Sequence, residues 1–361
     1  MVSVKAEWYN LSMLYKYLLK PILFKFDPEF IHDVFTSIGE FAGKFALTRS
    51  IASLAYGYHG KDISRVVDGL TYRTPLVLSA GFDYNARLTR ILPCISFGGV
   101  EVGSVTARPC VGNPKPRMTR LIHSQSLLVN KGLRNSGVDA IIARLAREPR
   151  VPDFVIGVSI TRTNDALSRS VEEGIKDYVY SYKRLNETNT GDYYTINISC
   201  PNAFDGEAFT TPELLERLLL ALREVHSTKP LYLKMPISLP WEEVDRLIAV
   251  GIKYKINGII IGNLQKNYEV LAFRDEAPKE YRGGLSGMPT QKVSNEYIAL
   301  AHKKYGDEIT IIGCGGVFTP DDAKVKFDSG AKIIHMITGM IFNGPGVLKE
   351  ICQSVAENKT K

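Results

Sequence analysis

The chain has 361 residues, of which 45% are hydrophobic and 23% charged, so it is predicted to be a folded globular protein rather than a disordered one. Its net charge of +7 suits an anionic substrate, an anionic membrane surface or nucleic acid, but the absence of a basic arm with interleaved aromatics disfavours nucleic acid. Five scattered cysteines without a CxxC pair argue against a zinc ribbon or a disulfide framework, and favour a reducing compartment.

Residues 8 to about 50 are predicted to be helical. Apolar residues recur near helical spacing in the first part, but lysines interrupt them too often for a signal peptide or a membrane span. Pro21 is expected to divide this part into two segments. A further helix is predicted from Asp27 as N-cap, with Pro28 at its first position, to a stop at Gly43.

The composition of this helical region leaves two interpretations open. Leu, Phe and Tyr with lysines at the edges are typical of an amphipathic segment that lies on a membrane surface. The same pattern also fits a helical hairpin packed on the main domain, and the residues alone slightly favour that second interpretation.

From residue 71 onward, short runs rich in β-branched residues alternate with stretches of helical periodicity. The eight runs are 74–81, 98–105, 153–160, 193–199, 231–236, 257–263, 309–316 and 331–338. Thr-Pro pairs at 211–212 and 319–320 are expected to start two of the helices, and Gly251 to end another. This alternation predicts an α/β fold, a (β/α)8 TIM barrel over residues 61–361 with an N-terminal helical extension over residues 1–60. An open doubly wound sheet is the alternative, disfavoured because no GxGxxG follows the first strand.

The working residues of such a barrel lie at the carboxyl ends of the strands. These ends carry small residues, amides and one lysine: Ser79, Ala80, Gly81, Ser104, Ser159, Asn197, Cys200, Asn202, Lys234, Asn263, Gly315, Gly316, Thr338 and Gly339. The set lacks metal-ligand spacing and paired carboxylates, so it argues against metal-dependent hydrolysis and glycosidase chemistry, and no metal site is predicted.

Three glycine-containing loops near the last strands have a specific physical use. The loops at 283–287, 311–316 and 338–339 expose backbone N–H groups with few side chains in the way. Barrels commonly hold a phosphate group in the loops after strands seven and eight. Ordinary tight turns are the alternative, but three such sites on adjacent loops favour phosphate.

Lys234 stands inside an otherwise apolar strand, where its charge needs an anionic or acceptor partner. A flavin held by its phosphate could supply that partner, because its reduced pyrimidine edge carries negative charge. The alternative is a lysine at a frayed strand end that reaches water.

Cys200 follows the fourth strand and is flanked by Asn197 and Asn202. A thiolate can accept a proton where neither histidine nor carboxylate is available, and the amides can hold the edges of a planar heterocycle. A lone cysteine is more often a small buried hydrophobe. His335, within the last strand, is expected to be a hydrogen-bonded core imidazole rather than a catalyst.

Several motifs, in order along almost the whole chain, carry a family resemblance. They are LYKYLLKPILFKFDPEFIHD (14–33), GNPKPRM (112–118), INISCPN (196–202), GGLSG (283–287), IIGCGG (311–316) and IFNGP (341–345). The chain resembles the class 2, membrane-associated, quinone-reducing dihydroorotate dehydrogenases. The resemblance implies bound FMN, oxidation of dihydroorotate to orotate, and transfer of electrons to quinone. It also implies that quinone enters through the N-terminal helices, held peripherally on the cytoplasmic face of a membrane, and so reverses the preference for plain packing.

The resemblance assigns roles to individual residues. Cys200 occupies the position of the catalytic base. The implied FMN-binding residues are Ala80, Gly81, Ser104, Ser159, Asn197, Lys234, Gly262, Gly287, Gly315, Gly316, Thr338 and Gly339. The implied substrate-binding residues are Tyr84, Asn130, Asn197, Asn202 and Asn263.

The chain departs from the family pattern mainly around the substrate. Class 2 members usually carry serine as the base, where this chain has Cys200. The lysine of the family's AGxDK motif is Tyr84, the asparagine of NRMGF is Val129, and the hydroxyl residue after Asn263 is Leu264. The flavin contacts are thus better retained than the substrate contacts.

Two interpretations of the departures follow. Either the pocket rebuilds its substrate contacts with Lys131 or Arg134, or the substrate differs. A divergent flavin oxidoreductase of the same fold acting on another small substrate, and a non-catalytic relative, therefore remain alternatives.

Overall fold

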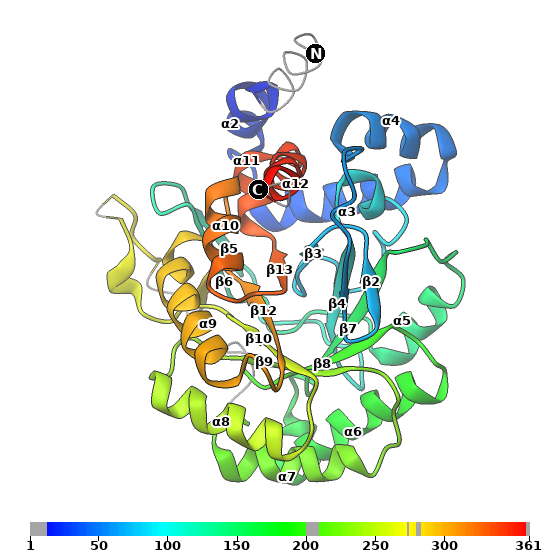
Figure 1. The fold of residues 1–361 in the computed structure, drawn as a ribbon, viewed down its shortest axis with the longest axis vertical. Helices are drawn as coiled ribbons and strands as arrows, with labels where there is room; N and C mark the ends of the chain where they lie inside the picture. The colour runs from blue at the N-terminus through cyan, green and yellow to red at the C-terminus, as the bar shows by residue number, and fades with distance from the viewer. Residues whose placement is uncertain (1–12, 200–208, 273, 279–282, 359–361) are drawn as a thin grey trace.

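The computed structural model describes residues 13–199, 209–272, 274–278 and 283–358. Eight parallel strands form a closed barrel in chain order, with helices around its outside (Figure 1). The strands are β3 (Leu76–Leu78), β4 (Gly99–Val105), β7 (Val155–Ile160), β8 (Tyr193–Asn197), β9 (Leu231–Met235), β10 (Gly258–Ile261), β12 (Thr310–Cys314) and β13 (Ile333–Met336). Each lies within one of the eight predicted runs, so the predicted (β/α)8 barrel is confirmed.

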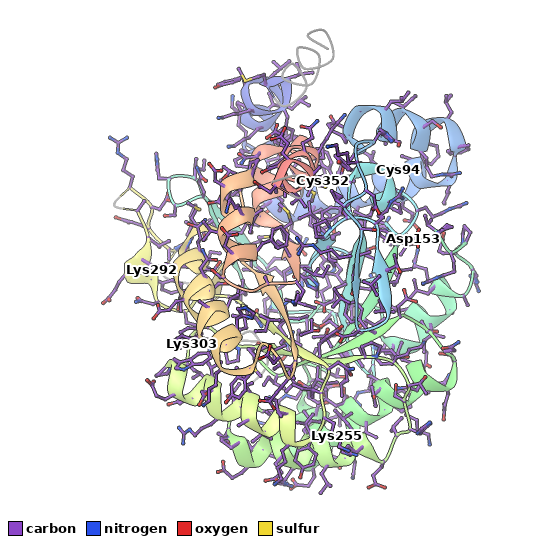
Figure 2. The ribbon with its side chains drawn as sticks, in the orientation of Figure 1. Cys94, Asp153, Lys255, Lys292, Lys303 and Cys352 are labelled. Atoms are coloured by element: carbon purple, nitrogen blue, oxygen red, sulfur yellow. The ribbon has the colours of Figure 1, made fainter. Side chains whose placement is uncertain are left out.

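The helices pack apolar faces on the barrel. They are α5 (Val138–Leu145), α6 (Val171–Glu187), α7 (Pro212–Arg223), α8 (Trp241–Lys253), α9 (Gln291–Tyr305), α10 (Pro320–Asp328), α11 (Thr338–Asn343) and α12 (Gly346–Asn358). Exposed lysines such as Lys292 and Lys303 lie on the outer side of α9 (Figure 2). Thr211 and Thr319 cap α7 and α10 as predicted. The prediction for Gly251 is wrong: α8 continues past it, and a Cβ there would meet Ile256 at 2.5 Å.

The two ends of the barrel interior differ. A hairpin of β1 (Arg65–Val67) and β2 (Leu70–Tyr72) lies against an interior layer of apolar and aromatic side chains, including Tyr193 and Tyr232. Further along the strands, at their carboxyl ends, the interior side chains become polar. Closing one end with an apolar layer therefore leaves the chemistry at the other end, as the barrel architecture predicts.

The N-terminal helices lie across the upper part of the molecule in Figure 1. A π-helical turn, η1 (Tyr15–Leu19), runs into α2 (Lys20–Leu23), followed by α3 (Pro28–Lys44) and α4 (Ala46–Tyr56). Asp27 caps α3 as predicted, accepting from the Phe30 N–H at 2.8 Å. The two segments predicted around Pro21 are present as η1 and α2, with Pro21 in the first turn of α2, but the backbone stays helical between them and leaves the helix only after Leu23. The wide π turn before the proline relieves the clash that a regular helix would suffer there.

A small antiparallel sheet beside the barrel mouth was not predicted. It joins β5 (Met118–Leu121), β6 (Ser126–Val129) and β11 (Gly284–Leu285) in the order β11-β6-β5. The loop after β6 carries Lys131 and Arg134 towards α3, so this sheet brings charge to the junction between the helices and the barrel.

Candidate active site

One continuous cavity of about 530 Å³ runs from the pair α3–α4 to the carboxyl ends of the barrel strands. Its helical part is lined by apolar side chains, among them Ile31, Phe35 and Ile38. Its barrel part is lined by Asn197, Lys234 and other polar residues. A molecule with an apolar tail and a polar head group could therefore reach the barrel mouth from the helices.

Lys234 lies at the floor of this cavity, on β9, and is buried. Its Nζ is 3.4 Å from Ser79 Oγ and 4.0 Å from a carboxylate oxygen of Glu101, which is fully buried on β4. Glu101 accepts from Thr195 Oγ1 at 2.6 Å. The lysine is thus no frayed strand end reaching water, and its loose contacts leave donor capacity towards the cavity.

His335, on β13, lies in the same floor and is fully buried. Burial lowers its pKa to about 4, so the ring is neutral at pH 7. Both ring nitrogens lack a hydrogen-bond partner among the described residues, although Glu101 lies 3.8 Å from Nδ1. The expectation of a hydrogen-bonded core imidazole is therefore wrong, and orphaned nitrogens beside a cavity indicate room for a polar ligand.

Four of the predicted residues form one hydrogen-bonded row above the floor. Ser159 and Ser104 share a bond of 2.8 Å between their hydroxyls, and Asn197 Nδ2 donates to Ser104 at 2.9 Å. Asn263 Nδ2 approaches Asn197 Oδ1 at 3.4 Å and donates to Ser199 Oγ at 2.6 Å. The row fixes the orientation of amide groups that can hold a planar heterocycle.

A second pocket of about 100 Å³ adjoins the cavity and shares Ala80, Lys234 and Thr338 with it. The predicted glycine loops line it, with Gly315 and Gly316 at φ +102° and +68°. A Cβ at these two positions would lie 2.4 Å from Thr290 and 2.3 Å from Gln291. Only glycine keeps this backbone conformation and spacing, so the loops present main chain rather than side chains to the pocket.

Tyr84 lies in the wall between the two parts of the cavity, after β3. Its hydroxyl lies 2.6 Å from Lys131 Nζ and 3.0 Å from His32 Nδ1 on α3. Burial lowers the pKa of His32 to about 4, so this ring is also neutral at pH 7. Burial lowers the pKa of Lys131 to about 8, which still leaves it mostly protonated at neutral pH.

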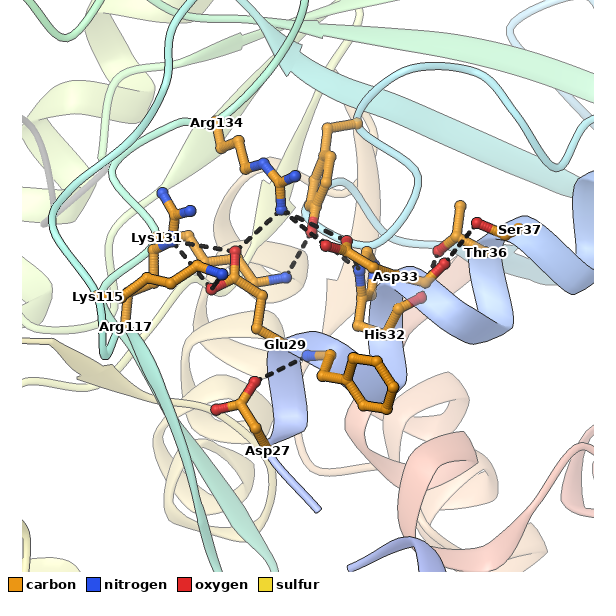
Figure 3. A network of polar contacts seen from close by, with 12 residues as sticks. Asp27, Glu29, His32, Asp33, Thr36, Ser37, Lys115, Arg117, Lys131 and Arg134 are labelled. Carbon is orange, nitrogen blue, oxygen red and sulfur yellow. Dashed lines mark hydrogen bonds and ion pairs between the residues drawn. The ribbon is translucent and has the colours of Figure 1, made fainter.

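A group of ion pairs surrounds this wall (Figure 3). The buried carboxylate of Glu29, on α3, contacts Arg117 at 3.0 Å and Arg134 at 2.9 Å, and Arg134 also contacts Asp33 at 3.1 Å. These contacts join α3 to the loops beside the barrel mouth. Both carboxylates pair with Arg134, which also lines the cavity, whereas no described carboxylate pairs with Lys131.

Most of the predicted site residues line one of the two hollows. The cavity and the adjoining pocket are lined by Ala80, Gly81, Tyr84, Ser104, Asn197, Lys234, Gly262, Asn263, Gly287, Gly315, Gly316, Thr338 and Gly339. Ser159 lies behind them, bonded to Ser104. Asn130 lines neither hollow, and its side chain accepts from Asn113 at 2.8 Å. Cys200 and Asn202 lie outside the described residues.

Sequence reasoning missed Glu101 and His32. Glu101 is the one charge in the run 98–105, and a carboxylate within an apolar barrel strand could have indicated a buried partner for Lys234. His32 had no such signal, because its contacts with Phe82 and Tyr84 join segments far apart in the sequence.

The comparisons with known proteins agree with this geometry. The family model described as dihydroorotate dehydrogenase matches residues 63–358. The chain belongs to this family. Relatives named dihydroorotate dehydrogenase (quinone) include one from Christiangramia forsetii, 35% identical over 95% of this chain and 99% of the relative. Another, from Burkholderia thailandensis, is 34% identical over 97% of this chain and 99% of the relative.

Two solved structures of the same family are similar over nearly the whole chain. Both are dihydroorotate dehydrogenases of Eimeria tenella, one in complex with ferulenol and one ligand-free, with TM-scores of 0.79 and 0.78. Each is 25% identical to this chain and covers 92% of it, with 92% and 96% of the solved chains covered. The similarity includes the barrel and extends beyond it, so membership in the family rests on sequence and fold together.

A dihydroorotate dehydrogenase carries a flavin, and the described residues fit one. The pocket of main-chain glycines suits a phosphate, and the row of Asn197 and Ser104 suits a heterocycle edge. Lys234 offers N–H donors nearby, and the neutral ring of His335 offers one donor and one acceptor. These features adjoin one another, because the cavity and the glycine pocket share Ala80, Lys234 and Thr338.

Proposed function

We propose that this protein oxidises dihydroorotate to orotate with FMN as its flavin and passes the electrons to quinone, as part of pyrimidine biosynthesis. The observation that carries the proposal is the continuous cavity, in which an apolar entrance between α3 and α4 leads to the amide row over Lys234. Relatives at 34–35% identity over nearly their full length bear this activity in their names.

In this proposal each residue of the site has a separate role in the reaction. The glycine loops and the row of Asn197 and Ser104 would hold FMN, whose chemistry would supply the hydride acceptor for C6 of dihydroorotate. Cys200, which stands where the family has its base, would take the C5 proton as a thiolate. Asn197 and Asn263 would hold the amide edges of the ring, and Lys234 would favour negative charge on the neighbouring heterocycle.

Quinone and the membrane would meet at the N-terminal helices. Large apolar side chains on α3 and α4 are exposed, including Phe41 at 62% and Leu47 at 72%. Several large apolar side chains exposed on two neighbouring helices favour a peripheral contact with lipid. No helix among the described residues is long and apolar enough to span a membrane. The cytoplasmic face of the membrane is the side proposed for this contact, as the family resemblance implies.

Anaerobic mixing of the purified flavoprotein with dihydroorotate tests the proposal. Bleaching of the flavin absorbance is expected, followed by recovery on addition of a short-chain quinone. Cys200→Ala should abolish the bleaching while retaining the bound flavin, and Cys200→Ser, which restores the usual class 2 base, should retain part of the rate.

A divergent flavin oxidoreductase with another small substrate is the second candidate, and Tyr84, Val129 and Leu264 favour it because they replace polar contacts. Normal flavin content without bleaching by dihydroorotate would support that candidate. Purification without a flavin chromophore would instead indicate a non-catalytic relative.

A further inference from the structure

Lys131 is a buried ammonium group in the wall of the cavity. It follows β6, is only 8% exposed, and contributes to the same cavity lining as Asn197 and Lys234. Burying an ammonium is costly unless its three donors find acceptors. The partners of Lys131 therefore indicate what else belongs beside it.

The hydrogen bonds around Lys131 have one consistent direction. His32 Nε2 lies 2.8 Å from the Phe82 carbonyl oxygen, which can only accept, so Nε2 carries the proton of the neutral ring. His32 Nδ1 is then an acceptor and accepts a hydrogen bond from the Tyr84 hydroxyl. The Tyr84 oxygen in turn accepts from Lys131 at 2.6 Å. The same assignment rules out a donated bond from Nδ1 to Asp33, although the two atoms lie 3.3 Å apart.

Tyr84 therefore accepts a hydrogen bond from one of the three N–H donors of Lys131. No other acceptor lies within hydrogen-bond distance of this Nζ among the described residues, and no described carboxylate lies within 4.0 Å of it. A second buried lysine shows the contrast, because Lys326 on α10 donates to both Ser294 and Asn295. Lys131 thus retains two donors beside a cavity.

The carboxylates near Lys131 form ion pairs with arginines instead of with Lys131. Glu29 and Asp33 on α3 contact Arg134, and Glu29 also contacts Arg117. Of the two cations that could rebuild the substrate contacts, Arg134 has two carboxylate partners through its Nη1, whereas Lys131 has no carboxylate partner among the described residues. An ammonium with free donors in a water-poor site is suited to an anionic oxygen of a ligand.

We propose that Lys131 binds the carboxylate of dihydroorotate and orotate, and so selects a 6-carboxylated pyrimidine over an uncharged one. The inference rests on the proposed function and deepens it. Lys131 supplies from the loop after β6 the positive charge that the chain lacks at position 84, and Tyr84 orients that charge rather than providing it. The pocket has been rebuilt rather than lost.

Equilibrium binding tests the proposal without turnover. Orotate and uracil, which differ by the carboxylate alone, are titrated into the oxidised flavoprotein and followed by the flavin absorbance spectrum and by calorimetry. Lys131→Met should weaken orotate binding about 10–100-fold, because a charge-assisted hydrogen bond is lost, and should change uracil binding less than about twofold. Lys115→Met is the matched control, because it removes a charge from the same group of ion pairs at an exposed position. This control should leave both affinities unchanged.

Three results would overturn the proposal. The first is orotate affinity that is unchanged in Lys131→Met, and the second is an equal loss of orotate and uracil binding. The third is a variant that binds orotate normally and is slow only in reoxidation by a short-chain quinone, which would place Lys131 on the quinone path. If Lys131→Met does not retain flavin, Tyr84→Phe replaces it and should weaken orotate binding about 2–10-fold, because the ammonium loses its anchor. Unchanged orotate binding in Tyr84→Phe would then count against the proposal.

The wild-type protein separates this inference from the proposed function. Wild-type protein that neither binds orotate nor is bleached by dihydroorotate contradicts the proposed function itself. Wild-type protein that does both, together with Lys131→Met that selects orotate over uracil as strongly as wild type, contradicts only the role of Lys131.

Discussion

Helices α3 and α8 pack against the same barrel, but α8 turns its apolar face inward and α3 turns its polar face inward. Helix α8 buries Val244, Leu247 and Ile248 and carries its charges outside, as amphipathic helices of water-soluble proteins do. The side chains that α3 buries are polar or small, with Glu29 and His32 among them, whereas Ile38 and Phe41 are exposed. The two helices thus follow the same periodicity with the apolar face turned in opposite directions.

This difference indicates that the inner side of α3 is held mainly by polar contacts, because its large apolar side chains Ile38 and Phe41 stay exposed. Burial of an apolar face stabilises a helix wherever water is the outside medium. An apolar face turned outward is favourable only where lipid or an apolar ligand covers it. The arrangement of α3 therefore fits a helix that separates a polar site from an apolar surrounding.

The largest effect is expected at Glu29. Glu29→Gln removes the carboxylate between Arg117 and Arg134 and leaves a buried guanidinium unpaired, which should cost about 3–5 kcal/mol of stability at the α3 junction. Urea unfolding and hydrogen exchange over residues 28–44 measure this. Glu216→Gln, which removes an exposed ion pair with Lys253, is the control and should be close to wild type. Equal stability of both variants would show that the polar face does not hold α3.

The next effect contrasts the apolar residues of the two helices. Leu247→Ala opens a cavity under α8 and should lower the free energy of unfolding by about 2–5 kcal/mol. Phe41→Ala removes a larger side chain from the exposed face of α3 and should change the free energy of unfolding by less than about 0.5 kcal/mol. Urea titration of the detergent-free protein measures both. A large loss at Phe41 in water would mean that its ring is covered within the protein.

A third experiment tests what covers the outer face. Leu47, Ile51 and Leu54 lie on one face of α4 and are each more than half exposed. Replacing all three by serine should weaken binding to phospholipid vesicles by roughly tenfold or more, because apolar area no longer enters the bilayer interface. Vesicle sedimentation measures the fraction of protein bound to the vesicles. Leu220→Ser, at an exposed site on α7, should bind vesicles like wild type, and equal binding by the triple variant would exclude this face as the membrane contact.

The smallest effect concerns pH and the wall between the two regions. Lys131 has a pKa of about 8, and Glu29, Asp33, Arg117, Arg134 and Tyr84 face it. Orotate affinity should fall by up to about tenfold per pH unit above pH 8, as the ammonium loses its proton, and Lys131→Met should lose this dependence. The unfolded protein holds this proton up to a pKa of about 10.5, so the contribution of Lys131 to stability rises across the same window. Loss of the Lys131 proton therefore does not itself destabilise the fold. Calorimetry between pH 7 and 9.5 measures the orotate affinity.

The sequence predicts the barrel well because its signals are local. Eight β-branched runs, Thr-Pro caps and the Asp27 cap each depend on a few neighbouring residues, and each is confirmed. The glycine loops and the amide row come together because the carboxyl ends of parallel strands share one rim.

What could not be predicted depends on contacts across long sequence separations. The pairing of Glu101 with Lys234, and of His32 with Tyr84, leaves no pattern in either segment. The orientation of α3 was equally hidden, because periodicity reveals an apolar face but not whether it turns towards the barrel or away. The roles of Cys200 and Asn202 stay predictions, since both lie outside the described residues.

The row from Lys131 through Tyr84 to His32 has a consequence for regulation. It begins at the wall of the ring cavity and ends on the helix that presents its apolar face outward. A ligand bound by the spare donors of Lys131 would act on this row, and if α3 contacts lipid as proposed, occupancy of the ring cavity and attachment to lipid would be thermodynamically linked. Such linkage would be reciprocal. If binding to the bilayer changes the affinity for orotate by a given factor, orotate changes the affinity of the protein for the membrane by the same factor.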